Sequence, residues 1–273
     1  MTAIFWVNLD SRQDRRAFME AQFAQLGLAA ERIAAVTPDV LDAATRAMGP
    51  TLATSELCVT ASHRLAWRRL LELEFPHALI LEDDAHLSGV LAAFLGSAPS
   101  VLGDLDLVRI ETGRRRVRVG LPTHRLDCGV TLHRAHSDQW GTAGYLITDR
   151  CARRLLAEPQ LFVAPLDRAL FDPLQSVLST DDWRQCAPGL CIQGDQLDRS
   201  DANALWRSDV TTQRRQHRAE DPHRKTPKTW RQKLVRETER TLRQGRLALR
   251  DVAQFFSEGV RWTTIQYLAS ERE

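Results

Sequence analysis

The sequence predicts an α/β fold in which helices cover both faces of a mixed, mostly parallel sheet. The strongest signal is a short aliphatic run at residues 78–81 that ends in three consecutive carboxylates, Glu82, Asp83 and Asp84. A second signal is the start of the chain, where an apolar segment, a polar turn and an amphipathic segment follow one another as in a βαβ unit. The third is a hydrophobic content of 43% over 273 residues, which suffices for the core of one large domain or two small ones.

The first predicted elements are a strand, a helix and a second strand. Ala3–Leu9 is the first strand, and after a polar turn apolar residues recur at helical spacing as far as Gly27. Glu31–Val36 is the second strand. This order is common in nucleotide-binding folds, but the lack of a Gly-x-Gly-x-x-Gly or Walker lysine motif argues against a dinucleotide site or a P-loop. Asn8 and Asp10, at the first turn, suit either turn formation or ligand binding.

A long helix is predicted at Ser55–Glu74, and Pro76 ends it. His63, Trp67 and Leu70 fall on one of its faces, at positions i, i+4 and i+7. His63 is either a hydrogen-bonded core residue or a ligand. Its place on the helix that leads into the acidic strand makes it a candidate site residue.

The aliphatic run at residues 78–81 is too short for a typical helix and is therefore predicted to be a buried strand. Its three acids then lie at the carboxyl edge of the sheet, where open α/β sheets bind their ligands. Adjacent carboxylates repel one another unless a cation or a proton intervenes. Oxygen ligands of this kind suit Mg²⁺ or Mn²⁺, which keep part of their coordination shell for phosphates. The alternative is that solvated acids simply end the strand.

Four blocks of residues, in a fixed order, resemble glycosyltransferase family 25, the lipopolysaccharide and lipooligosaccharide galactosyltransferase type. They are Val7-Asn8-Leu9-Asp10 with Asp14-Arg15-Arg16; Glu56-x-Cys58 with Ser62, His63 and Trp67; Leu79-Ile80-Leu81-Glu82-Asp83-Asp84; and Trp140-Gly141-Thr142-Ala143-Gly144-Tyr145-Leu146-Ile147-Thr148. Weaker blocks are Ala164-Pro165-Leu166-Asp167 and Pro188–Gln193. The ordered set covers residues 4–195, approximately.

The resemblance implies a GT-A-like nucleotide-binding sandwich that uses a UDP-sugar and a divalent cation, Mn²⁺ or Mg²⁺, and inverts the anomeric centre. It also implies that Glu82-Asp83-Asp84 takes the place of the DxD motif of such enzymes, with Asp83 and Asp84 at the metal. Because the triplet begins with Glu, the resemblance does not identify which of the three carboxylates contacts the ribose. The implied donor-binding residues are Asn8, Asp10, Arg15, Ser62, His63, Glu82, Asp83, Trp140, Gly141 and Thr142.

An inverting transfer needs a general base that takes the proton of the acceptor hydroxyl. Asp167, which follows Pro165 at the start of a helical segment, is the first candidate, and the same position suits a helix cap. Asp138 is the second candidate. Trp140, close to it, either stacks on a sugar ring or belongs to the core. Further acids that the sequence leaves open as metal or acceptor contacts are Asp181, Asp182, Asp195 and Asp198.

A basic turn, Gly113-Arg114-Arg115-Arg116, follows a strand predicted at Leu105–Ile110. Its guanidinium groups suit a phosphate or an anionic acceptor. They equally suit a solvated charged surface, which is the more common reason for a run of like charges.

The charge of the chain is unevenly divided, with a net −5 over residues 1–210 and +7 over residues 211–273. We therefore expect a GT-A-like glycosyltransferase domain at 1–210 and a basic linker with an amphipathic helical tail at 211–273. An irregular apolar stripe from Trp230 to Val260 lies among arginines, a pattern that suits an anionic membrane surface. The alternative is a helix that packs on the domain or on a dimer partner.

The location expected from the sequence is cytoplasmic, peripheral on the cytoplasmic face of the inner membrane. The N-terminus lacks the basic region of a signal peptide, and no apolar stretch approaches the ~20 residues of a spanning helix. The five cysteines are an odd number without zinc-finger spacing, so they are predicted to be reduced thiols.

The predicted function is metal-dependent transfer of a hexose, galactose by the resemblance, from a UDP-sugar to a lipooligosaccharide or other cell-surface glycan. One alternative is a metal-dependent nucleotidyltransferase, which would release pyrophosphate instead of UDP. Another is a non-catalytic protein whose basic tail binds nucleic acid. The negative charge of residues 1–210 and the lack of a nucleic-acid-binding motif argue against it, so no nucleic-acid partner is expected.

Overall fold

The structure is a computed structural model that describes residues 2–103, 105–197, 255 and 259–269. Its strands are β1 (Ala3–Asn8), β2 (Glu31–Ala34), β3 (His77–Glu82), β4 (Ala85–Leu87), β5 (Leu107–Arg109), β6 (Arg116–Arg125), β7 (Thr131–Ala135), β8 (Gly144–Thr148), β9 (Trp183–Ala187), β10 (Cys191–Gln193) and β11 (Arg261–Thr264). Its helices are α1 (Gln13–Leu26), α2 (Ala43–Met48), α3 (Thr54–Glu72), α4 (Leu91–Val101), α5 (Asp149–Ala157), α6 (Leu166–Phe171) and α7 (Gly194–Leu197), with a 3-10 helix η1 (Pro159–Phe162).

The described strands form a nine-stranded sheet in the order β11-β6-β7-β9-β5-β8-β3-β1-β2, while β4 and β10 form a separate pair. In the large sheet, β1 is parallel to β2 and β3, and β5 is parallel to β9. The other pairings are antiparallel, because β8 lies between β3 and β5 in the opposite direction and β6, β7 and β11 form an antiparallel edge. The mixed sheet is confirmed. The expected parallel strands are β1, β2 and β3, together with β5 and β9.

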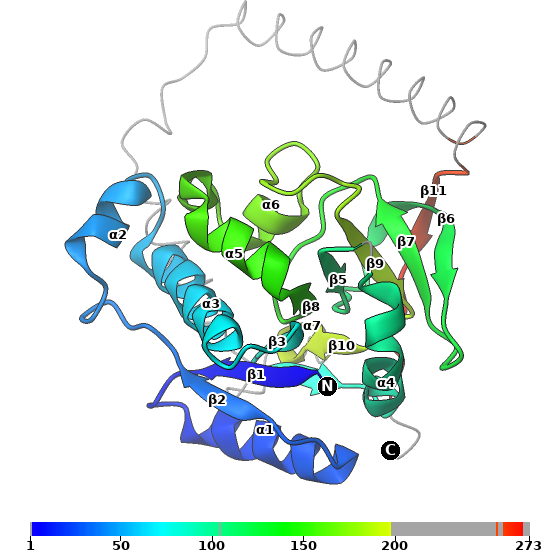
Figure 1. Ribbon diagram of the computed structural model, residues 1–273, viewed down its shortest axis with the longest axis horizontal. Coiled ribbons are helices and arrows are strands. Elements are labelled where there is room, and N and C mark those ends of the chain that lie inside the picture. The colour runs from blue at the N-terminus through cyan, green and yellow to red at the C-terminus, as the bar shows by residue number, and fades with distance from the viewer. Residues whose placement is uncertain (1, 104, 198–254, 256–258, 270–273) are drawn as a thin grey trace, which may run out of the picture.

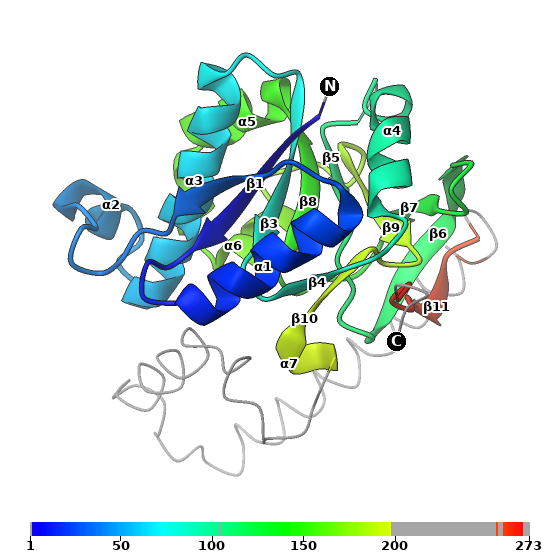
Figure 2. The same ribbon diagram turned by 90° about the horizontal axis from the view of Figure 1, so that it is seen from below.

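Helices cover both faces of the sheet, as predicted (Figures 1 and 2). Side chains of β1 alternate between the faces, so that Phe5 and Val7 join one hydrophobic cluster and Ile4 and Trp6 join another. The first cluster includes residues of α3, α5 and α6, and the second includes residues of α1 and α4. The result is a three-layer α/β arrangement with the sheet in the middle.

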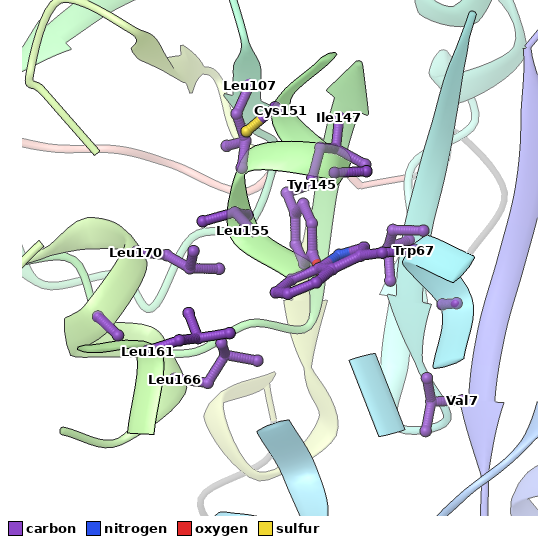
Figure 3. Close-up of a cluster of buried hydrophobic side chains, with 14 of the residues drawn as sticks. Val7, Trp67, Leu107, Tyr145, Ile147, Cys151, Leu155, Leu161, Leu166 and Leu170 are labelled. Carbon is purple, nitrogen blue, oxygen red and sulfur yellow. The ribbon is translucent and has the colours of Figure 1, made fainter. Parts of the chain in front are cut away.

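The aliphatic run that ends in the acids is β3, deep inside the sheet. All four residues at 78–81 have 0% exposure, which explains why the run is continuously apolar. On the α3 side, Nε1 of Trp67 donates to the hydroxyl of Tyr145 at 2.9 Å, and Nδ1 of His63 lies 2.8 Å from the same hydroxyl. Figure 3 shows Trp67 and Tyr145 within the cluster of leucines from α5 and α6. These hydrogen bonds satisfy Nε1 of Trp67, Nδ1 of His63 and the hydroxyl of Tyr145 within the core.

The direction of the strands brings distant parts of the chain to one edge of the sheet. Because β8 is antiparallel to both β3 and β5, the carboxyl ends of β1, β3 and β5 lie at the same edge as the amino end of β8. Asn8, Glu82, Glu111 and the segment 140–143 therefore meet there. This is the edge at which open α/β sheets bind their ligands.

The structure describes only part of the predicted tail. Residues 211–254 and 256–258, with most of the apolar stripe, lie outside the described residues. Arg261–Thr264, however, forms β11 and extends the large sheet beside β6. Ile265 is 4% exposed and packs with Val117 and Val119. The end of the predicted tail thus belongs to the sheet, which the sequence did not indicate because this strand is short and its partner lies far away in the chain.

All five cysteines are free thiols, as predicted. Within residues 2–103, 105–197, 255 and 259–269, no helix is both long enough and apolar enough to cross a bilayer. The membrane-binding helix expected at 230–260 falls almost entirely outside this part of the chain.

The contribution of the C-terminal segment to the fold is testable at Ile265. We expect Ile265→Ala to lower the free energy of unfolding by about 2 kcal/mol, because it removes buried methyl groups and leaves a cavity. Gln266→Ala, a change at an exposed neighbour, should stay within about 0.5 kcal/mol of the unaltered chain. Urea denaturation measures both, and equal stabilities for the two variants would contradict the packing of this segment on β6.

Candidate active site

A cavity of about 870 Å³ opens at the carboxyl edge of β1, β3 and β5. The predicted site residues that line it are Asn8, Arg15, Ser62, His63, Glu82, Asp83, Asp84, Asp138, Trp140, Gly141, Thr142 and Asp167. Asp10 is not among the lining residues; its side chain is 80% exposed and forms an ion pair with Arg32. The structure therefore brings all the predicted site residues together except Asp10.

Asp83 is fixed by a buried ion pair. Its Oδ1 lies 2.7 Å from Nη1 of Arg15 in α1, whose side chain is 9% exposed. Its Oδ2 accepts a hydrogen bond of 2.8 Å from Nδ2 of Asn8 at the end of β1. Both carboxylate oxygens are thus engaged, and the loss of either partner would leave a buried charge uncompensated. Asp83 joins β1, α1 and the acidic turn after β3.

Glu82 faces the cavity from the end of β3. Its carboxylate accepts a hydrogen bond from the hydroxyl of Thr142 and lies 3.4 Å from Nε2 of His63. Burial raises the pKa of Glu82, but the contacts with His63, Thr142 and Arg15 outweigh it and lower this pKa below its usual value. Glu82 is therefore ionised at neutral pH. One ring nitrogen of His63 bonds Tyr145 in the core, as a core residue would, and the other faces Glu82 at the cavity; its role as a ligand stays a prediction.

Asp84 and Asp195 present unpaired carboxylate oxygens. The side chain of Asp84 is 10% exposed, and its Oδ1 has no hydrogen-bond partner. Asp195, just after β10, also has a buried Oδ1 without a partner, and the preceding Gly194 N–H bonds the carbonyl of Asp84 at 2.9 Å. Burial raises the pKa of Asp84 well above its usual value, and the charges of Glu82 and other nearby carboxylates add to this despite Arg15.

These two carboxylates fit a divalent cation, which would satisfy both open oxygens and relieve their repulsion. Mg²⁺ and Mn²⁺ are commonly held by one or two carboxylates together with substrate phosphates. The part of the chain that the structure describes contains no group of three or more His, Cys, Asp or Glu side chains that could hold a metal. Asp83, expected beside Asp84 at the metal, has both oxygens engaged by Arg15 and Asn8, so Asp195 is the better second ligand.

The two candidate bases bond neighbouring residues, Trp140 and Gly141. Asp167, in the first turn of α6, is half-buried, and its Oδ2 accepts a hydrogen bond of 3.3 Å from the N–H of Gly141. Its Oδ1 accepts from the N–H of Arg168 at 2.9 Å, and Pro165 occupies the cap position of this helix, so Asp167 is not its N-cap. Asp138 is exposed and accepts a hydrogen bond from the indole of Trp140.

Trp140 is not a core residue, because 46% of it is exposed. Its ring is stacked with a guanidinium group: Cζ of Arg115 lies 4.1 Å from the ring centroid. The basic turn predicted at 113–116 therefore reaches the cavity, which Arg115 and Arg116 line. The turn is both exposed to solvent and at the rim of the cavity, so both interpretations of it stay open.

Ser62 lines the cavity, but its hydroxyl is engaged within the protein. It donates to the carbonyl of Cys58 at 2.7 Å and accepts from the N–H of Val36 at 2.8 Å. These bonds join α3 to the segment after β2. The expected contact of Ser62 with a donor stays a prediction.

Arg109 and Glu111 were missed by the sequence analysis. Both are buried and line the cavity, with Nη2 of Arg109 3.1 Å from Oε2 of Glu111. The same Oε2 accepts from the N–H of Ala143 at 2.9 Å, and Arg109 also donates to the carbonyl of Trp140, so the pair holds the segment 140–143. Burial raises the pKa of Glu111 to about 7. An acid directly after a predicted strand was the signal used for Glu82, and it applies equally to Glu111.

The close approach of Glu111 to the segment 140–143 explains why a glycine occupies position 141. Gly141 has a φ of +90°, and a Cβ at this position would lie 2.3 Å from Oε1 of Glu111. A side chain here would therefore both strain the backbone and displace the carboxylate.

Comparisons with known proteins show which family this chain is similar to. The chain matches the family model of glycosyltransferase family 25, an LPS biosynthesis protein family, over residues 1–170. It is 30% identical over 186 residues to a glycosyltransferase 25 family member of Drosophila pseudoobscura pseudoobscura, a match that covers 61% of this chain and 29% of that protein. It is 27% identical to the lacto-N-neotetraose biosynthesis glycosyltransferase LgtB of Neisseria meningitidis serogroup B, with 68% and 74% covered. Identity to procollagen galactosyltransferase 1-B of Xenopus laevis is also 27%, with 61% and 30% covered.

The match thus spans less than a third of the length of the two animal relatives and about three quarters of the bacterial one. The residues that match the family model include Arg15, the acidic turn, the segment 140–143 and Asp167, which all line the cavity. The family resemblance seen in the sequence is therefore confirmed. Because the family model covers more than half of the chain, this chain belongs to glycosyltransferase family 25.

Proposed function

We propose that this chain transfers a hexose from a UDP-sugar to a glycan acceptor, with inversion at the anomeric carbon and with Mn²⁺ or Mg²⁺ bound. Galactose is the proposed hexose because the Xenopus relative is named a galactosyltransferase. A lipooligosaccharide or other cell-surface glycan is the proposed acceptor because the family is described by LPS biosynthesis. The mixed sheet, with its ligand-facing residues at the carboxyl ends of β1 and β3, supports a GT-A-like fold.

The observation that carries the proposal is a buried Oδ1 without a hydrogen-bond partner on each of Asp84 and Asp195, in one cavity with Arg15, which forms an ion pair with the other oxygen of Asp84 at 3.6 Å. A nucleoside diphosphate is recognised through positive charge and through a metal held by few protein ligands. The cavity, at about 870 Å³, is within the usual size of a small-molecule site.

Negative charge develops on the diphosphate as its bond to the sugar breaks. A divalent cation held by Asp84 and Asp195 would supply electrostatic stabilisation of that charge. Asp83, fixed by Arg15 and Asn8, keeps the turn that carries Asp84 in position. Position matters because small displacements of such groups lower the rate strongly.

The acceptor hydroxyl loses its proton as it attacks the sugar from the face opposite UDP. Asp167 is the proposed base, because it is half-buried, lines the cavity and is oriented by the N–H of Gly141. Asp138 is the alternative base. Its carboxylate is exposed and already accepts a hydrogen bond from the indole of Trp140.

UDP release from a panel of UDP-sugars in the presence of Mn²⁺ tests the activity. Release of UDP from UDP-galactose, dependent on an added glycan, is the expected result. Release of pyrophosphate from a nucleoside triphosphate would instead indicate a nucleotidyltransferase.

The metal ligands are tested by Asp84→Asn and Asp195→Asn. Each change removes a charge that the cation would neutralise, so we expect metal-dependent UDP affinity to fall at least about tenfold, or about 1.4 kcal/mol. Calorimetry with UDP and Mn²⁺ measures it, with Asp149→Asn, an acid outside this cavity, as the matched control. If both variants kept the full metal-dependent UDP affinity at an unchanged melting temperature, the proposed metal site would be wrong.

The base is tested by Asp167→Asn, which should reduce kcat by about 10² to 10⁴ because a general base contributes that much to the rate. UDP affinity should stay nearly unchanged, since Asp167 does not contact the proposed metal ligands. Asp138→Asn, measured in parallel, is the comparison. A loss of turnover confined to Asp138→Asn would move the assignment to Asp138, and full activity in both would exclude both.

We also propose that residues 211–258 bind an anionic membrane surface, on the basis of their basic composition, and that the protein is peripheral on the cytoplasmic face of the inner membrane. Co-sedimentation with anionic liposomes should be strong at low salt and weak at high salt, because exposed charges are screened. Neutral liposomes are the control. Absence of binding to anionic liposomes at low salt would contradict the proposal.

A further inference from the structure

Arg115 and Arg116 lie at the cavity without an acidic partner. Both are exposed and line it, and neither forms an ion pair in the described part of the chain. The arginines deeper in the cavity differ, since Arg15 pairs with Asp83 and Arg109 pairs with Glu111. The charge of Arg115 and Arg116 is therefore available to a ligand.

Both guanidinium groups lie over tryptophan rings. Cζ of Arg115 is 4.1 Å from the ring centroid of Trp140, and Cζ of Arg116 is 5.8 Å from that of Trp262 in β11. Stacking uses the flat face of a guanidinium group and leaves the N–H groups at its edge free to donate. Such edges match the oxygens of a phosphate or a carboxylate.

The turn that carries these arginines is fixed by contacts with two distant segments. Arg114 has a φ of 51°, in the left-handed region, and its N–H donates to Oγ1 of Thr112 at 3.1 Å. The hydroxyl of Thr112 donates to the carbonyl of Ile265 at 2.6 Å, and a Cβ at Gly189 would lie 2.6 Å from Cγ2 of Thr112. A strained non-glycine residue held in this way is typical of binding sites and does not suit a freely solvated loop.

The position of the turn assigns it to the acceptor. Trp140, whose ring Arg115 covers, donates to Asp138, and the next residue, Gly141, donates to Asp167. Since the acceptor hydroxyl must reach one of these two acids, the acceptor lies beside Arg115.

The donor phosphates belong elsewhere in the cavity, near Arg15, Asp84 and Asp195. No hydrogen bond or ion pair joins Arg115 or Arg116 to these three residues within the described chain. We therefore assign the donor phosphates and the acceptor to two different groups of residues within the same cavity.

We propose that Arg115 and Arg116, together with Trp140, bind a phosphate or carboxylate group of the sugar acceptor, so that the acceptor is an anionic glycan. The inference rests on the proposed glycosyltransferase function and specifies its substrate class. The ring of Trp140 would contact the apolar face of a sugar ring, and the arginines would bind its anionic substituent.

The test is binding of glucose 6-phosphate, glucuronic acid and glucose, measured by calorimetry with UDP and Mn²⁺ at saturation. Because UDP fills the donor region, a sugar that still binds occupies the acceptor region. We expect the two anionic sugars to bind at least about tenfold more tightly than glucose, with a preference that weakens as salt rises.

The variant for this test is the double substitution Arg115→Gln and Arg116→Gln, which should abolish the preference for anionic sugars. Arg125→Gln, at the other end of β6 and outside the cavity, is the matched control and should keep it. All three positions are exposed, so the melting temperatures should agree. Equal binding of glucose and the anionic sugars, or an unchanged preference in the double variant, would overturn the inference.

Three further outcomes distinguish this inference from the proposed function. Displacement of glucose 6-phosphate by UDP with Mn²⁺ would mean that the arginines serve the donor phosphates, which contradicts the acceptor assignment. UDP release from UDP-galactose without any preference for anionic sugars would overturn the inference alone. An anionic preference in a chain that binds no UDP would overturn the proposed function alone.

Discussion

The burial of several carboxylates at one edge of the sheet is the constraint on which this structure depends. Charges taken out of water are stable only when they are paired and hydrogen-bonded. Arg15 does this for Asp83, and Arg109 does it for Glu111. Each of these pairs also joins separate elements, since Arg15 comes from α1 and Glu111 bonds the segment before β8. The interactions that compensate the buried charges therefore also hold the cavity walls in position.

The compensation is incomplete at Asp84 and Asp195. Each has a buried oxygen without a partner, and the pKa of Asp84 is raised by its burial and by nearby carboxylates. A ligand that supplies positive charge there stabilises the folded chain by binding it preferentially. The unpartnered oxygens at this edge of the sheet therefore favour the joint binding of a cation and an anionic ligand, since each offsets the charge of the other. At the rim of the cavity the uncompensated charge is positive, because Arg115 and Arg116 lack an acidic partner among the described residues.

Much of the fold follows from local sequence patterns. The aliphatic run at 78–81 predicted a buried strand because it is too short for a typical helix and is apolar at consecutive positions, as a strand covered on both faces is. Helical spacing and Gly27, which adopts the left-handed conformation at the end of α1, predicted the first helix. His63 and Asp167 were found because each belongs to a short block with a fixed place in the order of elements. Asp10 was included for the same reason and proved to lie outside the cavity.

The rest depended on pairing between distant segments, which local patterns do not specify. Asp195 reaches Asp84 only because β10 pairs with β4, and the segment 140–143 reaches Glu111 only because β8 runs antiparallel between β3 and β5. A strand inserted in the parallel direction would have carried this segment to the opposite edge, away from both candidate bases. The direction of β8 is therefore what joins Trp140 and Arg115 to the acidic edge, and with it the proposed recognition of the acceptor to the chemistry.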